Sequence, residues 1–307
     1  MSRPPPARRF GLLTRWGRHP TLTPSPRWQA VTDGILRWVG SPVDVNCVLV
    51  QGDRLALLVD TGSTREEGME LRRAVEVELG RRELAVVNTH AHYDHCFGNS
   101  AFSESTIYAS EGCLTTLQRS GASQQREAAE SFREEDPEFA AQLGAAPIVL
   151  PNRPVGQEAR LDLGGIEAHL RVMGRGHTDH DLVVVLPDLG AILAGDLVEE
   201  SGPPALEDSY PLSWPRVLGR LLGLAPNLVV PGHGRVVGPE FVARQQEQLA
   251  QLASWCLGEL GMGPRVPQPP MPFPPAALGT ALDRAKIELS IGQSSAAADQ
   301  APEDAAP

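Results

Sequence analysis

Short apolar runs separated by Gly, Asp and Pro begin near residue 28, a pattern typical of strands joined by turns. The first three runs follow one another closely and predict a meander of antiparallel strands at 35–39, 43–50 and 55–59. Apolar residues then recur at helical spacing from Glu66 to Leu79, which predicts an amphipathic helix that ends at Gly80. Further short runs predict strands at 84–87 and 106–109.

The second half of the chain repeats this alternation. Apolar runs predict strands at 166–172, 182–186, 191–193 and 228–230, and helices at 214–222 and 239–257. The polar segment 111–143 predicts two helices, broken near Gly121 and Pro137. Strands and helices that alternate in two comparable halves predict an α/β protein whose sheets are covered by helices.

Both ends of the chain differ in amino-acid composition from the middle. Residues 1–27 carry six arginines and no acidic residue, which predicts a flexible basic arm. A Pro-rich tail follows from residue 259 to 307, with a short helix expected at 276–289 and disorder expected from Gly292. We therefore expect one folded domain at 28–258.

Composition narrows the class of partner. The chain has 307 residues and a net charge of −11, which argues against nucleic acid or an anionic membrane bound through bulk charge. No apolar run approaches the ~20 residues of a membrane helix. The four cysteines are scattered and no secretory signal is recognisable, which favours a cytoplasmic protein. The frequent use of Arg, Ala and Gly is typical of a bacterial protein. We expect a small-molecule substrate; the oligomeric state is not readable.

Three histidines and an aspartate stand together directly after the strand at 84–87. They form the motif His90-Ala91-His92-Tyr93-Asp94-His95. Imidazoles two residues apart on an extended segment point the same way, and a turn after His92 brings Asp94 and His95 to the other side. One such loop can serve two adjacent metal ions.

Two hydrolytic metal ions need more ligands than one loop supplies, because each takes about three protein ligands and keeps a position for water. Further candidates follow, each at a strand end beside glycine: His177, Asp196 and His233. Glycine permits the sharp turns that bring short side chains to a shared centre.

Asp60 in Val59-Asp60-Thr61-Gly62 adds a fifth motif to the loop at 90–95, His177, Asp196 and His233. The five motifs follow one another in the order found in the metallo-β-lactamase fold superfamily. Residues 28–258 therefore resemble this superfamily. The resemblance implies a four-layer αββα sandwich. It also implies that His90, His92 and His177 hold a first metal ion, that Asp94, His95 and His233 hold a second, and that Asp196 bridges them. Asp60 would support the metal-binding loop from behind. Zinc is the expected metal, with iron or manganese as alternatives.

The resemblance also implies a dinuclear metal-dependent hydrolase in which a metal-bridging hydroxide attacks an ester, thioester, lactone or similar carbonyl substrate. Asp94 would orient the hydroxide and pass its proton to the leaving group. True lactamases of this fold usually carry Cys or Ser where this chain has Asp196, so a β-lactamase is disfavoured. A phosphodiesterase is disfavoured by the acidic body.

Other readings stay open. The same motif residues occur in mononuclear-iron persulfide dioxygenases, and a scaffold with structural metals is a further alternative. Tyr210 is a candidate for contacting an oxyanion, although packing on its neighbours is the commoner role of a tyrosine. His180 is expected as an exposed turn residue, with a supporting role at the site as the alternative. Arg235 fits an ion pair or a substrate contact, and Cys96 a surrogate metal ligand or a buried thiol.

Overall fold

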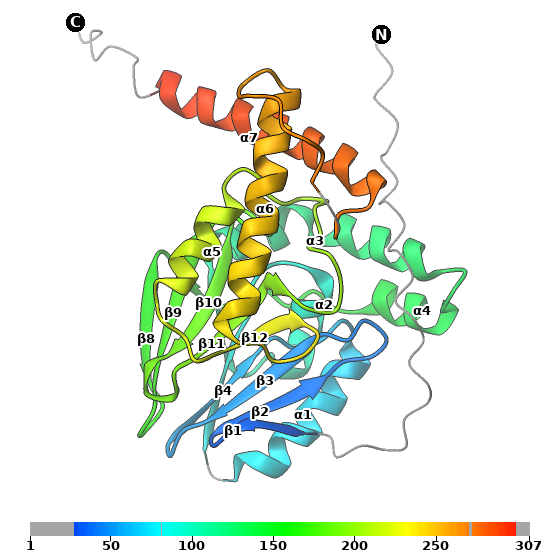
Figure 1. Cartoon of the computed structure of the whole chain (residues 1–307). Coiled ribbons are helices and arrows are strands. Elements are labelled where there is room, and N and C mark those ends of the chain that lie inside the picture. The colour runs from blue at the N-terminus through cyan, green and yellow to red at the C-terminus, as the bar shows by residue number, and fades with distance from the viewer. Residues whose placement is uncertain (1–27, 81, 270–271, 299–307) are drawn as a thin grey trace, which may run out of the picture.

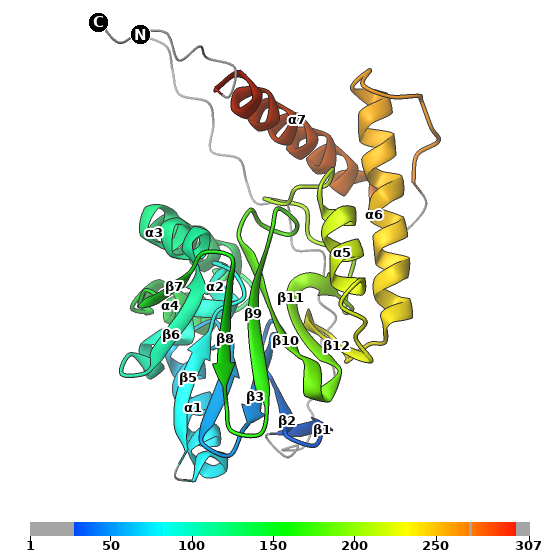
Figure 2. The ribbon, with the colours of Figure 1, turned by 90° about the vertical axis from the view of Figure 1, so that its left-hand side faces the viewer.

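Two β-sheets lie face to face between outer layers of helices in the computed structural model of the chain, which confirms the predicted αββα sandwich (Figures 1 and 2). The structure describes residues 28–80, 82–269 and 272–298. The predicted basic arm at 1–27, which includes His19, and the last nine residues of the tail lie outside these ranges.

The first sheet has seven strands in sequential order: β1 (Gln29–Thr32), β2 (Ile35–Val39), β3 (Asn46–Gln51), β4 (Leu55–Val59), β5 (Glu83–Val87), β6 (Thr106–Ser110) and β7 (Arg153–Val155). Strands β1 to β4 form the predicted antiparallel meander. The pairs from β4 to β7 are parallel, because α1 (Arg65–Leu79) and later helices return the chain between them.

The second sheet has five strands in the order β12 (Leu228–His233), β11 (Ala191–Glu199), β10 (Asp181–Leu186), β9 (Glu167–Gly174) and β8 (Glu158–Asp162). Among its described strands, β11 and β12 pair in parallel and the other neighbours pair antiparallel. Every residue of β10 and β11 is buried, which explains their nearly continuous apolar sequences: each strand has a sheet on one side and helices on the other.

Three apolar clusters mark the boundaries between the four layers. One fills the space between the sheets and includes Val59, Val87 and Val184. A second joins the first sheet to α1. The third joins the second sheet to α5 (Trp214–Leu222), α6 (Pro239–Glu259) and α7 (Pro275–Ala298) on the opposite outer side (Figure 2).

Segment 111–143 differs from the prediction. Helix α3 (Glu111–Phe132) continues through Gly121, and the only break precedes Pro137, where α4 (Pro137–Ala145) begins. The predicted break at Gly121 is wrong, because this glycine serves packing: a Cβ there would lie 3.3 Å from the side chain of Ile148. Strands β1, β7 and β8 were not predicted; they are short, and all three lie at sheet edges.

The C-terminal segment also differs from the prediction. Helix α7 extends to Ala298, so the expected disorder from Gly292 is wrong for 292–298. Phe273, Leu278, Ala281 and Ala285 are buried in the same apolar cluster as α5 and α6. The globular unit therefore does not end at residue 258. None of the helices in the described ranges is both long and apolar enough to cross a membrane.

Candidate metal centre

Side chains from the ends of three strands, from within a fourth strand and from one short helix meet at one edge of the two sheets. The segment after β5 carries His90 and His92, and α2 (Tyr93–Cys96) carries Asp94 and His95. His177 follows β9, Asp196 lies within β11, and His233 ends β12. The carboxyl ends of the parallel strands β4 and β5 and of β11 and β12 point to this edge, which explains why residues far apart in sequence converge.

The predicted first set of ligands forms one compact group: His90, His92, His177 and Asp196. Nε2 of His90 and Nε2 of His177 each lie 3.0 Å from Nδ1 of His92. Oδ2 of Asp196 lies 3.8 Å from Nε2 of His90 and 3.6 Å from Nε2 of His177. Three ring nitrogens and one carboxylate oxygen therefore face a common point.

The predicted second set forms an adjacent group: Asp94, His95 and His233. Oδ2 of Asp94 lies 3.1 Å from Nε2 of His233 and 3.7 Å from Nε2 of His95. Asp196 reaches this group as well, with Oδ1 3.3 Å from His95 and Oδ2 3.5 Å from His233. Its carboxylate thus lies between the two groups, the position that the resemblance assigns to a bridging ligand.

The donor set fits divalent metal ions. Nε2 of His95 and Oδ1 of Asp196 are buried polar atoms 3.3 Å apart, and neither has a partner in hydrogen-bond geometry among the described residues. Burial lowers the pKa of His177 to about 4, and burial together with the neighbouring imidazoles holds the pKa of His90 well below its usual value. Both rings are therefore neutral at pH 7, the form that binds metal.

The charges at the second group are compatible with a bound cation. Burial alone would raise the pKa of Asp196, but His95 and His233 outweigh it and hold that pKa well below its usual value. Burial alone would lower the pKa of His95, but Asp196, Asp94 and Asp60 hold it well above its usual value. The buried carboxylates thus require positive charge beside them, and a divalent ion supplies it without protonated imidazoles.

Asp60 lies behind the second group, as the resemblance implies. Its Oδ2 lies 2.8 Å from Nδ1 of His95, and its two oxygens accept hydrogen bonds from the backbone N–H and the hydroxyl of Thr89, each at 2.8 Å. Asp60 is 1 % exposed and has a φ of 62°. One carboxylate therefore fixes both the ring of His95 and the start of the metal-binding loop.

Two further carboxylates contact the histidines of the first group and were not identified as such from the sequence. Oδ2 of Asp208 lies 3.0 Å from Nε2 of His92, and Oε1 of buried Glu199 lies 3.5 Å from Nδ1 of His177. Both residues come from the segment after Asp196. The sequence shows that this segment is acidic, but it does not show which of the acidic side chains turns towards the histidines.

His180 is 4 % exposed, so the expectation of an exposed turn residue is wrong. Its Nε2 accepts a hydrogen bond from the backbone N–H of Ala91, and its Nδ1 lies 2.6 Å from Oδ1 of Asp179. The carbonyl of Ala91 accepts a hydrogen bond from Gln124 of α3. Both polar backbone groups between His90 and His92 are thus held by side chains from elsewhere in the fold.

Glycine at position 232 permits the close approach of β12 to the site. A Cβ on Gly232 would lie 1.7 Å from Oδ1 of Asp196, so any other residue would displace that carboxylate. Such contact of backbone with a buried carboxylate requires a residue without a side chain.

The remaining candidates lie outside both ligand groups. The guanidinium groups of Arg175 and Arg284 lie over the ring of Tyr210, 5.4 and 5.2 Å from its centroid. Arg235 forms an ion pair with Glu200 at 2.6 Å. Cys96 is buried and its Sγ donates to the carbonyl of His92 at 3.0 Å.

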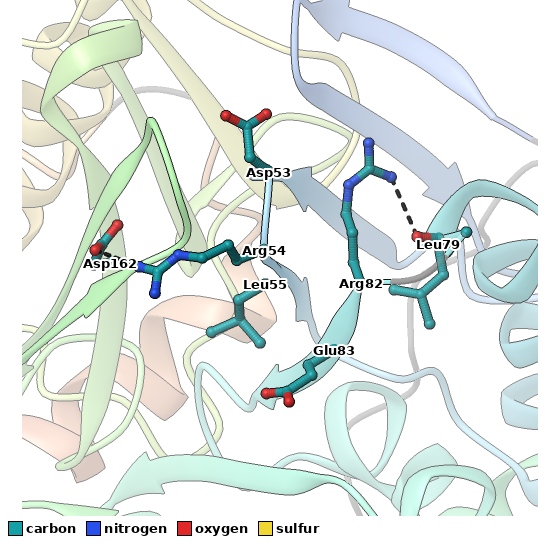
Figure 3. Close-up of a pocket in the computed structure, with 8 residues that line it drawn as sticks. Asp53, Arg54, Leu55, Leu79, Arg82, Glu83 and Asp162 are labelled. Atoms are coloured by element: carbon teal, nitrogen blue, oxygen red, sulfur yellow. Dashed lines mark hydrogen bonds and ion pairs between the residues drawn. The ribbon is translucent and has the colours of Figure 1, made fainter.

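A hollow of about 740 Å³ lies at the other end of β5, near Glu83, and is lined by both acidic and basic residues (Figure 3). It contains none of the predicted ligands. Three of its charged side chains are already engaged: Arg54 pairs with Asp162, and Arg82 donates to the carbonyls of Glu78 and Leu79. The convergence of ligands at the opposite strand ends therefore identifies the candidate site.

Comparison with known proteins agrees with this geometry. The family model described as the metallo-beta-lactamase superfamily matches residues 40–233, a range that contains all seven predicted ligands. A "Metallo-beta-lactamase type 2" of Bacillus sp. (strain 170) is 29 % identical over 202 residues, which cover 64 % of this chain and 69 % of that protein. A protein of the same name from Bacillus cereus is 28 % identical over 202 residues, 64 % of this chain and 70 % of that one.

Solved structures show the same fold. A metallo-beta-lactamase from Pontibacter korlensis superposes with a TM-score of 0.61 at 20 % identity, covering 72 % of this chain and 97 % of that one. The DIM-1 metallo-beta-lactamase superposes with a TM-score of 0.59 at 21 % identity, covering 74 % of this chain and 98 % of that one.

Proposed function

The chain belongs to the metallo-β-lactamase superfamily, and on that premise we propose that it is a hydrolase that binds two divalent metal ions and cleaves an ester, thioester, lactone or similar carbonyl substrate. The observation that carries the proposal is the place of Asp196. Its carboxylate lies within 3.8 Å of ring nitrogens from both ligand groups, so one residue can contact two ions.

The chain's residues divide between the two ions. His90, His92 and His177 would hold the first, and Asp94, His95 and His233 the second, with Asp196 shared. When bound, a pair of divalent cations acts as Lewis acid on the substrate carbonyl and lowers the pKa of water towards neutrality. Five imidazoles and two carboxylates suit zinc, and they also accept iron or manganese.

Asp94 has the geometry for moving a proton. Its side chain is 12 % exposed, against 7 % for Asp196, and its Oδ2 is held by His233 at 3.1 Å. A fixed and partly exposed carboxylate beside the reacting centre can accept a proton from water and deliver it to a leaving group. Tyr210 has no assigned step in this proposal, because its ring packs against the guanidinium groups of two arginines.

The identity of residue 196 and the net charge of the chain limit the candidate substrate classes. The relatives found by comparison are named metallo-beta-lactamases, whereas lactamases of this fold usually carry Cys or Ser at the position of Asp196. We therefore place carbonyl esters and thioesters ahead of β-lactams. The net charge of −11 disfavours nucleic acid, and four buried free cysteines support a reducing, cytoplasmic setting for a small-molecule enzyme.

The test is hydrolysis of a panel of thioester, ester, lactone, β-lactam and phosphodiester substrates by zinc-loaded full-length protein. His90→Ala should lower kcat/KM at least about 100-fold on the active substrate. His169→Ala is the matched control, because His169 pairs with Glu167 on β9 and belongs to neither ligand group. Hydrolysis that is equal in wild type and His90→Ala would contradict the proposal.

A second candidate is a mononuclear-iron persulfide dioxygenase. The observation that favours it is the first ligand group, whose four residues could hold a single iron ion without the second group. Protein that contains iron as its dominant metal and consumes oxygen with glutathione persulfide would establish it. The same protein would then leave the thioester and ester panel unhydrolysed.

A further inference from the structure

One face of α7 lies against the segment 206–213, the later part of the connection between the strand of Asp196 and α5. Arg284 and Glu288 are one helical turn apart and therefore point to the same side. On the adjoining stripe, Leu278, Ala281 and Ala285 are buried against α5 and α6. The helix is thus anchored in the core at the level where it meets this segment.

Arg284 holds the middle of the segment through its backbone. Its Nε donates to the carbonyl of Ser209 at 2.8 Å, and Nη2 donates to the carbonyl of Asp208 at 2.6 Å. Its guanidinium also lies over the ring of Tyr210, 5.2 Å from the centroid. A planar guanidinium can make two such parallel bonds, which a lysine ammonium cannot reproduce.

Glu288 holds the end of the same segment. Its carboxylate accepts hydrogen bonds from the backbone N–H of Leu212 at 2.9 Å and from the hydroxyl of Ser213. Glu288 is 8 % exposed, and both partners lie directly before α5. Two side chains of α7 therefore fix the segment on either side of Tyr210.

The held segment delivers a carboxylate to the metal centre. The carbonyl of Asp208 accepts from Arg284, while the side chain of Asp208 lies 3.0 Å from Nε2 of His92. Nδ1 of His92 faces His90 and His177. A hydrogen bond from Nε2–H to Asp208 keeps the lone pair on Nδ1 directed at the first ligand group.

We propose that Arg284 of α7 is a positioning residue for the metal centre: it fixes the backbone of Asp208, so that the Asp208 carboxylate sets the orientation and tautomer of His92. The inference rests on the proposed metal binding of the first ligand group. It assigns to the C-terminal helix, which lies outside the matched family region 40–233, a part in building the site.

The test measures zinc retention, which requires no substrate. Full-length zinc-loaded protein is mixed with an excess of a chromogenic chelator, and the apparent zinc affinity is read from the equilibrium. Arg284→Ala should weaken retention of the more labile zinc about 10-fold, in the range known for residues that support a metal ligand. Lys286→Ala, which removes a positive charge from the exposed side of the same helix, should leave retention unchanged.

A double variant separates positioning from general stability. If Arg284 acts through Asp208, Arg284→Ala added to Asp208→Ala should cause no further loss of zinc. Should Arg284→Ala fail to fold, Arg284→Lys serves in its place, because it keeps the charge and loses the paired bonds.

Retention in the Arg284 variant equal to that of Lys286→Ala, or losses that multiply in the double variant, would overturn the inference. Neither result would bear on the proposed hydrolysis. Conversely, a wild type that holds zinc and cleaves no substrate of the panel would contradict the proposed function and leave this test intact.

Discussion

Oδ2 of Asp60 lies 2.8 Å from Nδ1 of His95, and neither side chain is more than 2 % exposed. The bond fixes the ring of His95 so that Nε2 is directed at Asp94 and Asp196. Asp60 adopts a φ of 62°, a conformation that only Gly, Asn and Asp take readily. The position thus requires both a carboxylate and a residue that tolerates a left-handed backbone.

Replacing Asp60 with Asn separates these two requirements. Asn keeps the backbone conformation and removes the charge, so Asp60→Asn should fold and bind the more labile metal about 10- to 100-fold more weakly. Titration calorimetry with zinc measures the change. Asp33→Asn, on an exposed turn between β1 and β2, is the control. Equal zinc affinity in the two variants would show that Asp60 does not support metal binding.

Two helical glycines should respond in opposite ways to alanine. A Cβ on Gly68 of α1 would lie 2.6 Å from the carbonyl oxygen of Gly98, in the turn that follows the metal-binding loop. We expect Gly68→Ala to lower the free energy of unfolding by ~1–3 kcal/mol, because the clash is with backbone. A Cβ on Gly279 of α7 would have no atom of the described residues within 4 Å, so Gly279→Ala should raise the free energy of unfolding by up to ~1 kcal/mol. Urea unfolding of both variants and of wild type measures the two changes in the free energy of unfolding.

Asp181 should make stability depend on pH. Burial raises the pKa of this carboxyl to about 8, although Thr178 donates to it from both its N–H and its hydroxyl. The folded state then holds a proton that the unfolded state has lost, so its stabilising contribution is complete below about pH 4 and is lost as pH rises to about 8. Asp181→Asn keeps an acceptor for Thr178 and does not titrate.

The measurement is the free energy of unfolding from urea titrations at pH 5.5, 6.5 and 7.5. Wild type should lose up to about 1.4 kcal/mol per pH unit from this group, and Asp181→Asn should show a flatter profile by that amount. Parallel profiles for the two proteins would mean that Asp181 is ionised throughout this range.

Local pattern was sufficient for most of the fold. Strands β2 and β4 and helix α5 begin and end where the apolar runs predict, because each buries a face whose spacing is visible in the sequence. The predicted ligands also converge. Four of the histidines follow or end a strand, and these strand ends meet at one edge. Glycine beside His177, Asp196 and His233 was a local sign of the turns involved.

Relationships across long stretches of chain were not visible. Asp208 and His92 are 116 residues apart, and Arg284 and Asp208 are 76 apart. The sequence shows an acidic segment and a Pro-rich tail, but only tertiary packing decides that Asp208 turns inward and that α7 lies against it. The burial of His180 has the same origin, because its partner is the backbone of Ala91, 89 residues away.

The content of divalent metal in purified, zinc-loaded full-length protein, determined by elemental analysis, tests the central claim most directly. Two complete ligand groups that share Asp196 predict close to two ions per chain. Asp196→Ala, in which the shared carboxylate is missing, should contain clearly fewer, while His169→Ala should match wild type. One ion or none in wild type, or undiminished metal in Asp196→Ala, would contradict the account.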